Sequence, residues 1–171
     1  MNKNGDDCYD LLERAIQYKD NQEVSRLVPM LDADAVPFSL WSAVANKYTH
    51  AVALLVARSE CHDNEHSLWV AVSQNYVEGV KLLLPICDPR KNNSHCLRRA
   101  VLNDHMEIFE LLYPVSDAQV ALKQLQSSDQ FDEQPDRAHK CVFVELEARV
   151  LQKTLTRHVG TVGTAPPASK M

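Results

Sequence analysis

The chain has 171 residues, of which 45% are hydrophobic and 24% are charged, and its formal net charge is −5 at pH 7. This length suits one domain with a sizeable core, and the composition excludes a wholly disordered chain. Lys and Arg are scattered, and no run of about 18 apolar residues occurs. We therefore expect neither a nucleic-acid partner nor a membrane partner.

The N-terminus and the cysteines indicate the compartment. The first residues, MNKNGDDCYD, lack the apolar segment of a secretory signal, and the five cysteines form no CxxC pair. Both features predict reduced thiols and a cytoplasmic protein. Secretion by a route without a signal peptide stays open.

One sequence pattern recurs four times along the first two thirds of the chain: Leu, two variable residues, Ala, and a branched apolar residue. The instances are Leu12–Ile16, Leu40–Val44, Leu68–Val72 and Leu97–Val101. Their alanines, at 15, 43, 71 and 100, follow one another at steps of 28, 28 and 29 residues. A fixed step of this size is typical of stacked repeat proteins. Positions below are counted from each alanine as zero.

Each unit is predicted to be a helical hairpin. Positions −3, 0 and +1 share one face of a first helix, and positions +8, +9, +12 and +13 share one face of a second. Asn and Asp residues between the two helices suit a tight turn. Prolines at +14, namely Pro29, Pro85 and Pro114, are expected to end the second helix. The predicted units cover residues 7–32, 36–59, 64–88 and 92–117.

These units resemble ankyrin repeats. The resemblance rests on Leu68, Ala71, Val72, Val80, Leu82, Leu83 and Leu84 in unit three, and on Leu97, Ala100, Val101, His105, Phe109, Leu111 and Leu112 in unit four. It implies an all-α, ankyrin-like α-solenoid of stacked hairpins. Two features depart from the family pattern. Lys19, Lys47, Asn75 and Asp104 replace the usual turn glycine, and a step shorter than about 33 residues leaves room only for short loops.

Residues 118–157 are predicted to form a divergent helical cap, and 158–171 a flexible tail. A helix at about 117–126, with Asp117 as its cap, precedes a polar loop, SSDQFDEQPD. A longer helix at about 137–157 carries an apolar stripe of Cys141, Val144, Ala148, Leu151 and Leu155. We expect this stripe to cover the open end of the stack, as solenoids require. The alternative is a coiled-coil or partner-docking helix.

Catalytic and metal-binding patterns are weak. The best metal clusters are Cys61 with His62 and His66, and Cys87 with His95 and Cys96, but zinc needs about four convergent ligands. No motif supports Cys96 with His105 as a nucleophile pair. We therefore expect no metal, no cofactor and no enzymatic activity. The alternative is a small metal-dependent or Cys/His hydrolase on a helical scaffold.

Partner binding has better candidates. The ankyrin resemblance implies that positions +2 and +3 and the adjoining turn face a partner, and aromatic rings contribute strongly to interfaces. Trp41 and Trp69, both at −2, are either an exposed hot spot or packing between units, and we favour packing. The candidate partner-binding residues are Tyr18, Asn46, Tyr48, Gln74, Tyr76, Asn103, His105, Trp41 and Trp69.

The sequence thus predicts a non-enzymatic protein–protein interaction module. Its concave face would bind a partner protein of unknown identity. The module would serve as an inhibitor or immunity-type protein, or as an adaptor or secreted effector. We expect a monomer, with self-association through the C-terminal helix as the alternative.

Overall fold

A computed structural model describes residues 3–59, 64–127 and 141–162. Ten α-helices occupy these residues, and the described part contains no strand, which confirms the prediction of an all-α chain. The helices are α1 (Lys3–Tyr18), α2 (Asn21–Leu27), α3 (Val36–Ala45), α4 (Thr49–Val56), α5 (Glu65–Ser73), α6 (Val77–Leu83), α7 (Lys91–Leu102), α8 (Met106–Leu112), α9 (Ala118–Ser127) and α10 (Cys141–Val162).

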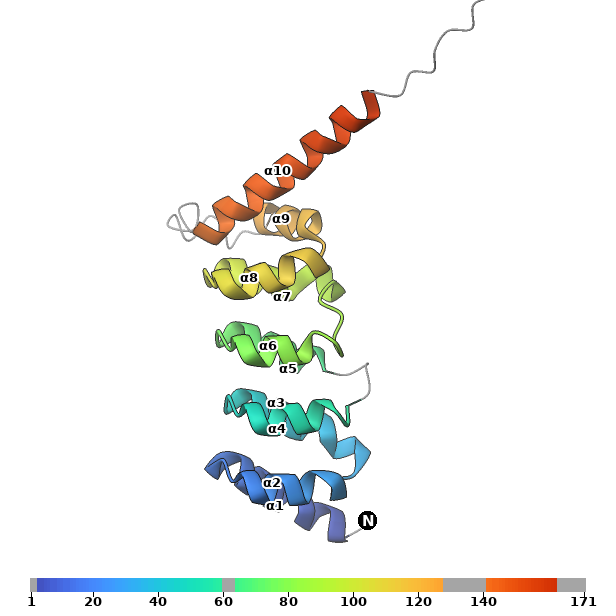
Figure 1. Ribbon diagram of the computed structural model, residues 1–171, viewed down its shortest axis with the longest axis vertical. Coiled ribbons are helices and arrows are strands. Elements are labelled where there is room, and N and C mark those ends of the chain that lie inside the picture. Colours follow the sequence, from blue (N-terminus) through green and yellow to red (C-terminus); the bar gives the residue numbers. More distant parts are fainter. Residues whose placement is uncertain (1–2, 60–63, 128–140, 163–171) are drawn as a thin grey trace, which may run out of the picture.

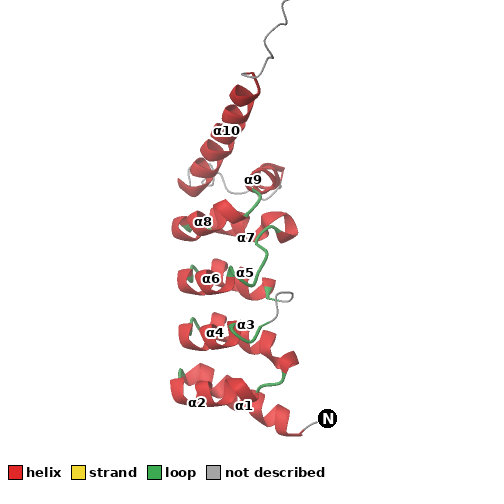
Figure 2. Ribbon diagram, turned by 45° about the vertical axis from the view of Figure 1, so that its right-hand side comes forward, coloured by secondary structure: helices red, strands yellow, loops and turns green. Residues whose placement is uncertain are grey.

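The helices form an elongated stack (Figures 1 and 2). Helices α1 to α8 pair as four hairpins that lie one above the next. The first helices α1, α3, α5 and α7 contact one another in sequence, and α9 continues their layer. The second helices α2, α4, α6 and α8 form a parallel layer. Each unit therefore packs on its neighbours, as expected when no single hairpin can bury its own apolar face.

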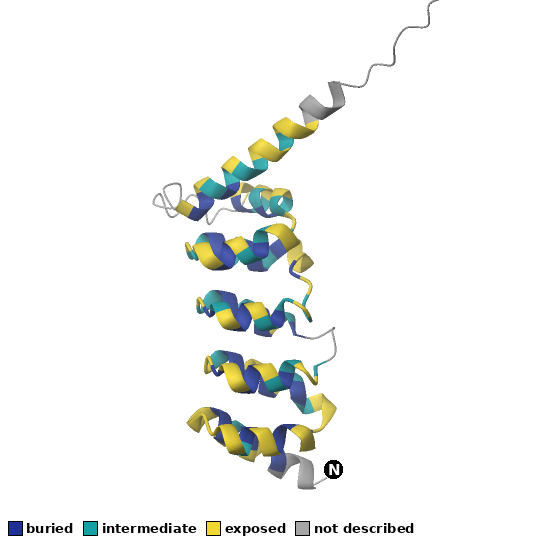
Figure 3. Cartoon of the chain, viewed as in Figure 1, coloured by how far each residue is buried: buried dark blue, intermediate teal, exposed yellow. Residues whose placement is uncertain are grey.

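The repeat register matches the core. The residues at positions 0, +1, +9 and +12 are buried in every unit, and most have no exposed surface (Figure 3). Asp20 caps α2, since its Oδ1 accepts hydrogen bonds from the amides of Gln22 and Glu23 at 3.0 and 3.1 Å. The prolines also act as predicted, because α2, α6 and α8 each end two residues before Pro29, Pro85 and Pro114.

All four hairpin turns have the same backbone. Position +4 is left-handed in each, with φ between 49° and 59°, and the amide at +5 donates to the alanine carbonyl at 2.8–2.9 Å. The residues at +4 are Lys19, Lys47, Asn75 and Asp104. These four residues are of three types, Lys, Asn and Asp, which differ in their tolerance of this conformation, because only glycine, and to a lesser degree Asn and Asp, adopts it routinely.

Replacing Lys19 with glycine is therefore expected to raise the free energy of unfolding by about 0.5–1 kcal/mol, because glycine relieves the left-handed strain. The Lys19 side chain is exposed and makes no hydrogen bond among the described residues, so little else changes. Asn75→Gly is the matched control, with an expected change near zero. Urea denaturation of both variants measures the difference. Equal effects would contradict a role for side-chain type at this position.

Helix α10 covers the end of the stack with a different face from the one predicted. Its buried residues are Val142, Phe143 and Leu146, and it contacts α7, α8 and α9. The predicted stripe is exposed instead: Val144, Leu151 and Leu155 are 51%, 63% and 58% exposed, and Cys141 and Ala148 also face solvent. The prediction that this stripe caps the stack was wrong. The helix has two apolar stripes, and the one with Val142, Phe143 and Leu146 is the one that packs against α7, α8 and α9.

Two polar contacts set the orientation of α10. The Asp104 carboxylate, in the turn of unit four, accepts a hydrogen bond from the amide of Val142 at 3.0 Å. It thereby pairs one of the free amides in the first turn of α10. The Arg149 guanidinium donates to both carboxylate oxygens of Glu110 on α8. It also lies 5.2 Å from the ring centre of Phe109 and 5.1 Å from that of Tyr113.

The remaining sequence predictions differ in outcome. Asp117 caps α9 as expected, because its Oδ1 accepts from the amide of Val120 at 3.1 Å. Ser94 lies in a left-handed turn near the start of α7, and its hydroxyl accepts from the amide of Asp117 at 2.9 Å. Helix α10 extends to Val162, beyond the predicted start of the tail. The predicted loop at 128–136 and the tail from 163 lie outside the described residues.

Candidate functional site

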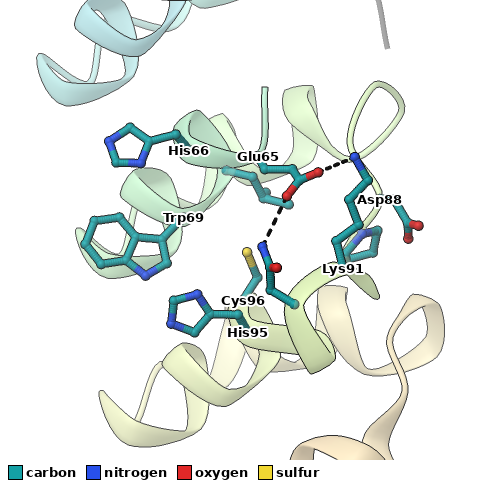
Figure 4. Close-up of a pocket in the computed structure, with 10 residues that line it drawn as sticks. Glu65, His66, Trp69, Asp88, Lys91, His95 and Cys96 are labelled. Carbon is teal, nitrogen blue, oxygen red and sulfur yellow. Dashed lines mark hydrogen bonds and ion pairs between the residues drawn. The ribbon is translucent and has the colours of Figure 1, made fainter. Parts of the chain in front are cut away.

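Four aromatic rings form a column along the first-helix layer, which we call the aromatic ladder: Trp41, His66, Trp69 and His95. Successive ring centres are 6.2, 5.7 and 6.3 Å apart, and the ring planes differ by 25°, 17° and 28°. The two tryptophans lie at −2 and the two histidines at −5, three positions apart on one helix face. Each tryptophan therefore stacks on the histidine of the following unit. Figure 4 shows His66, Trp69 and His95.

Trp69 lies in the middle of the ladder, with a histidine on each side. The Arg99 guanidinium lies 5.6 Å from the Trp69 ring centre, which is within cation–π range, and its Nε donates to Ser73 Oγ at 3.3 Å. The indole Nε1 is buried and meets no hydrogen-bond acceptor among the described residues. Trp69 thus links units three and four through its ring faces.

The end of the ladder in unit two is more exposed to solvent. Trp41 is 43% exposed, and Phe38, which shares position −5 with the two histidines, is 66% exposed. Both side chains line a groove of about 800 Å³, together with Pro37, Asn64 and His66. Exposed aromatic side chains beside a groove are the typical composition of an interface hot spot.

A second groove, of about 440 Å³, lies further along the ladder. Trp69 and His95 line one side, and Glu65 and Lys91 form an ion pair on the other (Figure 4). Glu65 also accepts a hydrogen bond from Asn92 Nδ2 at 3.3 Å. The two grooves share His66, so they flank one continuous aromatic surface.

The His95 ring is electrostatically disfavoured as a cation. Partial burial lowers its pKa first, and the nearby Arg98 and Arg99 lower it further. The neutral ring is therefore the form that stacks on Trp69 at neutral pH.

Acidification is expected to destabilise the fold through His95. A histidine whose pKa is lower in the folded state leaves stability intact above its unfolded pKa of about 6.5, and that stability declines as the pH falls below it. The melting temperature should therefore drop between pH 7.5 and pH 5.5, and the drop should be smaller in His95→Gln. His50→Gln, on the exposed side of α4, is the control. An unchanged pH dependence in His95→Gln would contradict this assignment.

The predicted tyrosine row is not on the surface. Tyr48 and Tyr76 are 7% and 8% exposed, because residues at +5 begin the second helix and point toward the preceding unit. The Tyr48 hydroxyl donates to Asn21 Oδ1 at 2.6 Å, and the Tyr76 hydroxyl lies 2.8 Å from Thr49 Oγ1. The Tyr76 ring occupies the space that a Cβ on Gly79 would need. The expectation that these rings face a partner therefore has to be corrected.

The other predicted residues divide into two groups. His105, Gln74 and Asn103 bond to the preceding unit: His105 Nδ1 lies 2.9 Å from the Val72 carbonyl, and the two amides donate to the carbonyls of Ala45 and Ser73 at 3.3 and 3.4 Å. Their polar groups join neighbouring units. The exposed group is Tyr18, Asn46 and Trp41.

Sequence reasoning missed Phe38 and Arg99. Phe38 shares position −5 with His66 and His95, so the repeat register contained the signal. Arg99 lies at −1, where unit one has Arg14 and the other two units have Ser42 and Val70, and its contact with Trp69 depends on the packing between units.

The metal and nucleophile candidates find little support. Cys61 and His62 lie outside the described residues, and within the described ranges no group of three or more His, Cys, Asp or Glu side chains converges on a metal position. Burial, with a smaller contribution from Glu65, raises the pKa of the Cys96 thiol to about 12. A thiol with such a pKa supplies almost no thiolate at neutral pH.

Cys96 is therefore expected to resist alkylation, while the exposed Cys141 reacts. Iodoacetamide at pH 8 followed by peptide mass mapping should modify Cys141 at least tenfold faster than Cys96, since the thiolate is the reactive form. Denaturation in urea should equalise the two rates. Rapid labelling of Cys96 in the folded protein would overturn its assignment as a buried thiol.

Within the described residues, no helix has both the length and the apolar character needed to span a bilayer. Compared with family models, with curated proteins and with solved structures, the chain shows no significant match, so the functional proposal rests on the geometry of the ladder face.

Proposed function

We propose that the chain is a protein-binding module whose binding face is the aromatic ladder with its flanking grooves. The observation that carries the proposal is the exposure of Phe38 and Trp41 beside a groove of about 800 Å³ on a face that is otherwise well packed. Large rigid side chains lose little conformational entropy on binding. A face held by inter-unit stacking is also preformed, which favours affinity.

The charge along the ladder face indicates the chemistry of the partner. Position −2 holds Glu13, Trp41, Trp69 and Arg98 in the four units, an order that runs from acidic through aromatic to basic. Glu13 is half-buried and its pKa is raised mainly by burial, although hydrogen bonds from Ser42 and Ser39 oppose the shift. A partner segment with an apolar centre and an acidic end over unit four would complement this face.

The roles considered from the sequence use this face in the same way. Each of these roles, as an inhibitor, an immunity-type protein, an adaptor or a secreted effector, requires binding to a protein and no catalysed reaction. The hydrolase alternative has its best-placed nucleophile in Cys96, and the raised pKa of that thiol speaks against it.

Affinity capture from the native cells, read by mass spectrometry, tests the proposal. The baits are the wild type, the double variant Phe38→Ala/Trp41→Ala, and Met30→Ala. Met30 is 63% exposed in the linker after α2 and provides an exposed apolar control away from the ladder. We expect a partner that the wild type and Met30→Ala retain and the double variant loses.

The reconstituted complex supplies a direct readout. In a Trp69→Phe background, Trp41 is the only tryptophan, and its emission should shift to shorter wavelength when the captured partner covers it. Capture of the same proteins by all three baits, or an unchanged Trp41 spectrum in the complex, would reject the ladder as the binding face.

A further inference from the structure

Cationic side chains from two distant parts of the chain meet where α10 crosses the end of the stack. Arg90 precedes α7, whereas Lys153 and Arg157 lie on α10, and all three line one cavity of about 420 Å³. Among the described residues that line the cavity, only Asp117 carries a carboxylate. This excess of positive charge is notable in a chain whose net charge is −5.

The cavity also presents polar groups. Ser116 Oγ is buried and has no hydrogen-bond partner among the described residues. Arg90 Nε donates to the Val115 carbonyl at 3.3 Å, which holds the guanidinium at the cavity. The amides of Ala118 and Gln119 belong to the first turn of α9, where a helix leaves its N–H groups without intrahelical acceptors. The Asp117 carboxylate is engaged by the Val120 amide at 3.1 Å.

We infer that this cavity is a binding site for a phosphate monoester. A tetrahedral dianion matches the planar donors of arginine and the point charge of lysine, and helix N-termini favour such anions. The volume falls within the roughly 300–1,000 Å³ range of small-ligand sites, so it holds a phosphate together with a small carrier group. The Ser116 hydroxyl supplies a further donor at the same cavity, whereas the Thr154 hydroxyl donates to the Val150 carbonyl at 2.8 Å.

The bound phosphate would also tie α10 to the stack. Arg90 belongs to the repeat region and Lys153 to α10, so one anion bridges the two. Between Leu151 and Arg157, α10 has largely exposed side chains, and Leu151 and Leu155 contact solvent. Phosphate binding should therefore protect the C-terminal half of α10 from opening, in addition to occupying the cavity. The inference is independent of the ladder face, which lies on the first helices.

The test uses NMR titration of the full-length chain with inorganic phosphate and, separately, with O-phosphoserine at constant ionic strength. We expect saturable shifts of the Ser116 to Gln119 amides and slower amide exchange in α10. A tighter O-phosphoserine titration indicates a ligand that carries an organic group, whereas equal affinities indicate free phosphate as the ligand.

Arg90→Gln and Lys153→Gln are each expected to weaken phosphate binding at least tenfold. Lys123→Gln, at an exposed position on α9 outside the cavity, makes the same charge change and should leave the affinity unaltered. Circular dichroism checks that every variant is folded. Linear shifts without saturation, or equal losses in Lys123→Gln and Arg90→Gln, would show general ionic screening and overturn the site.

Discussion

Replacing Trp69 with alanine is expected to lower the free energy of unfolding by about 2–3 kcal/mol. Core Trp→Ala changes cost about 3–5 kcal/mol, and the partial exposure of Trp69 places it below that range. The change removes a ring that stacks on His66 and His95 and receives Arg99 on its face. Because these contacts connect units three and four, the loss should also reduce the cooperativity of unfolding.

Urea denaturation followed by circular dichroism measures this loss. Trp41→Ala is the matched comparison, with an expected cost of about 1 kcal/mol, because Trp41 is 43% exposed and stacks on one ring. Trp69→Phe should recover most of the stability, since it keeps an aromatic ring and removes the buried, unpartnered N–H. Equal losses from Trp41→Ala and Trp69→Ala would refute the central role of Trp69.

Replacing Arg149 with alanine is expected to release α10 from the stack and to destabilise the protein by about 1–2 kcal/mol. The side chain makes a bidentate pair with Glu110 and lies over the rings of Phe109 and Tyr113. A partly exposed ion pair contributes up to about 1 kcal/mol, and cation–π contacts of this kind contribute about 0.5–1 kcal/mol. Hydrogen exchange in α10 should accelerate markedly.

The pKa of Glu110 provides a second readout of the same contact. Hydrogen bonding from Arg149 is the main cause that lowers it, so the pKa should rise toward its ordinary value in Arg149→Ala. Arg149→Lys should give an intermediate result, because lysine keeps the positive charge but cannot donate two parallel hydrogen bonds to the carboxylate. Arg14→Ala, at an exposed position on α1 at the other end of the stack, is the control. Unchanged exchange in α10 would mean that its apolar contacts alone hold the helix.

The hairpins could be predicted from the sequence because their signals are local. The alanine register, the turn residues and the prolines at +14 depend on neighbours within about fifteen residues, and all of them have the expected structural counterparts. The all-α class followed from the same periodicity. The arrangement of units, by contrast, depends on contacts between residues 27 to 33 positions apart, such as the bond between His105 and the Val72 carbonyl.

The candidate site was harder to predict for the same reason. A tyrosine at +5 satisfies its hydroxyl on the preceding unit, and composition alone does not distinguish that position from an exposed one. Helix α10 carries two apolar stripes, and periodicity cannot select between them. The Arg149 contact with Glu110 and the Asp104 contact with Val142 select one face, and both partners come from elsewhere in the chain.

The aromatic ladder also makes the protein extendable. The repeat alanines of units two and three are 28 residues apart. Each of these units contributes one tryptophan that stacks on the histidine of the next unit. Inserting a duplicate of unit three after itself would preserve the register and add one more Trp–His step. Deleting unit three would shorten the column by one step. The length of the aromatic ladder is thus set by the number of units, so adding or removing a unit would lengthen or shorten it.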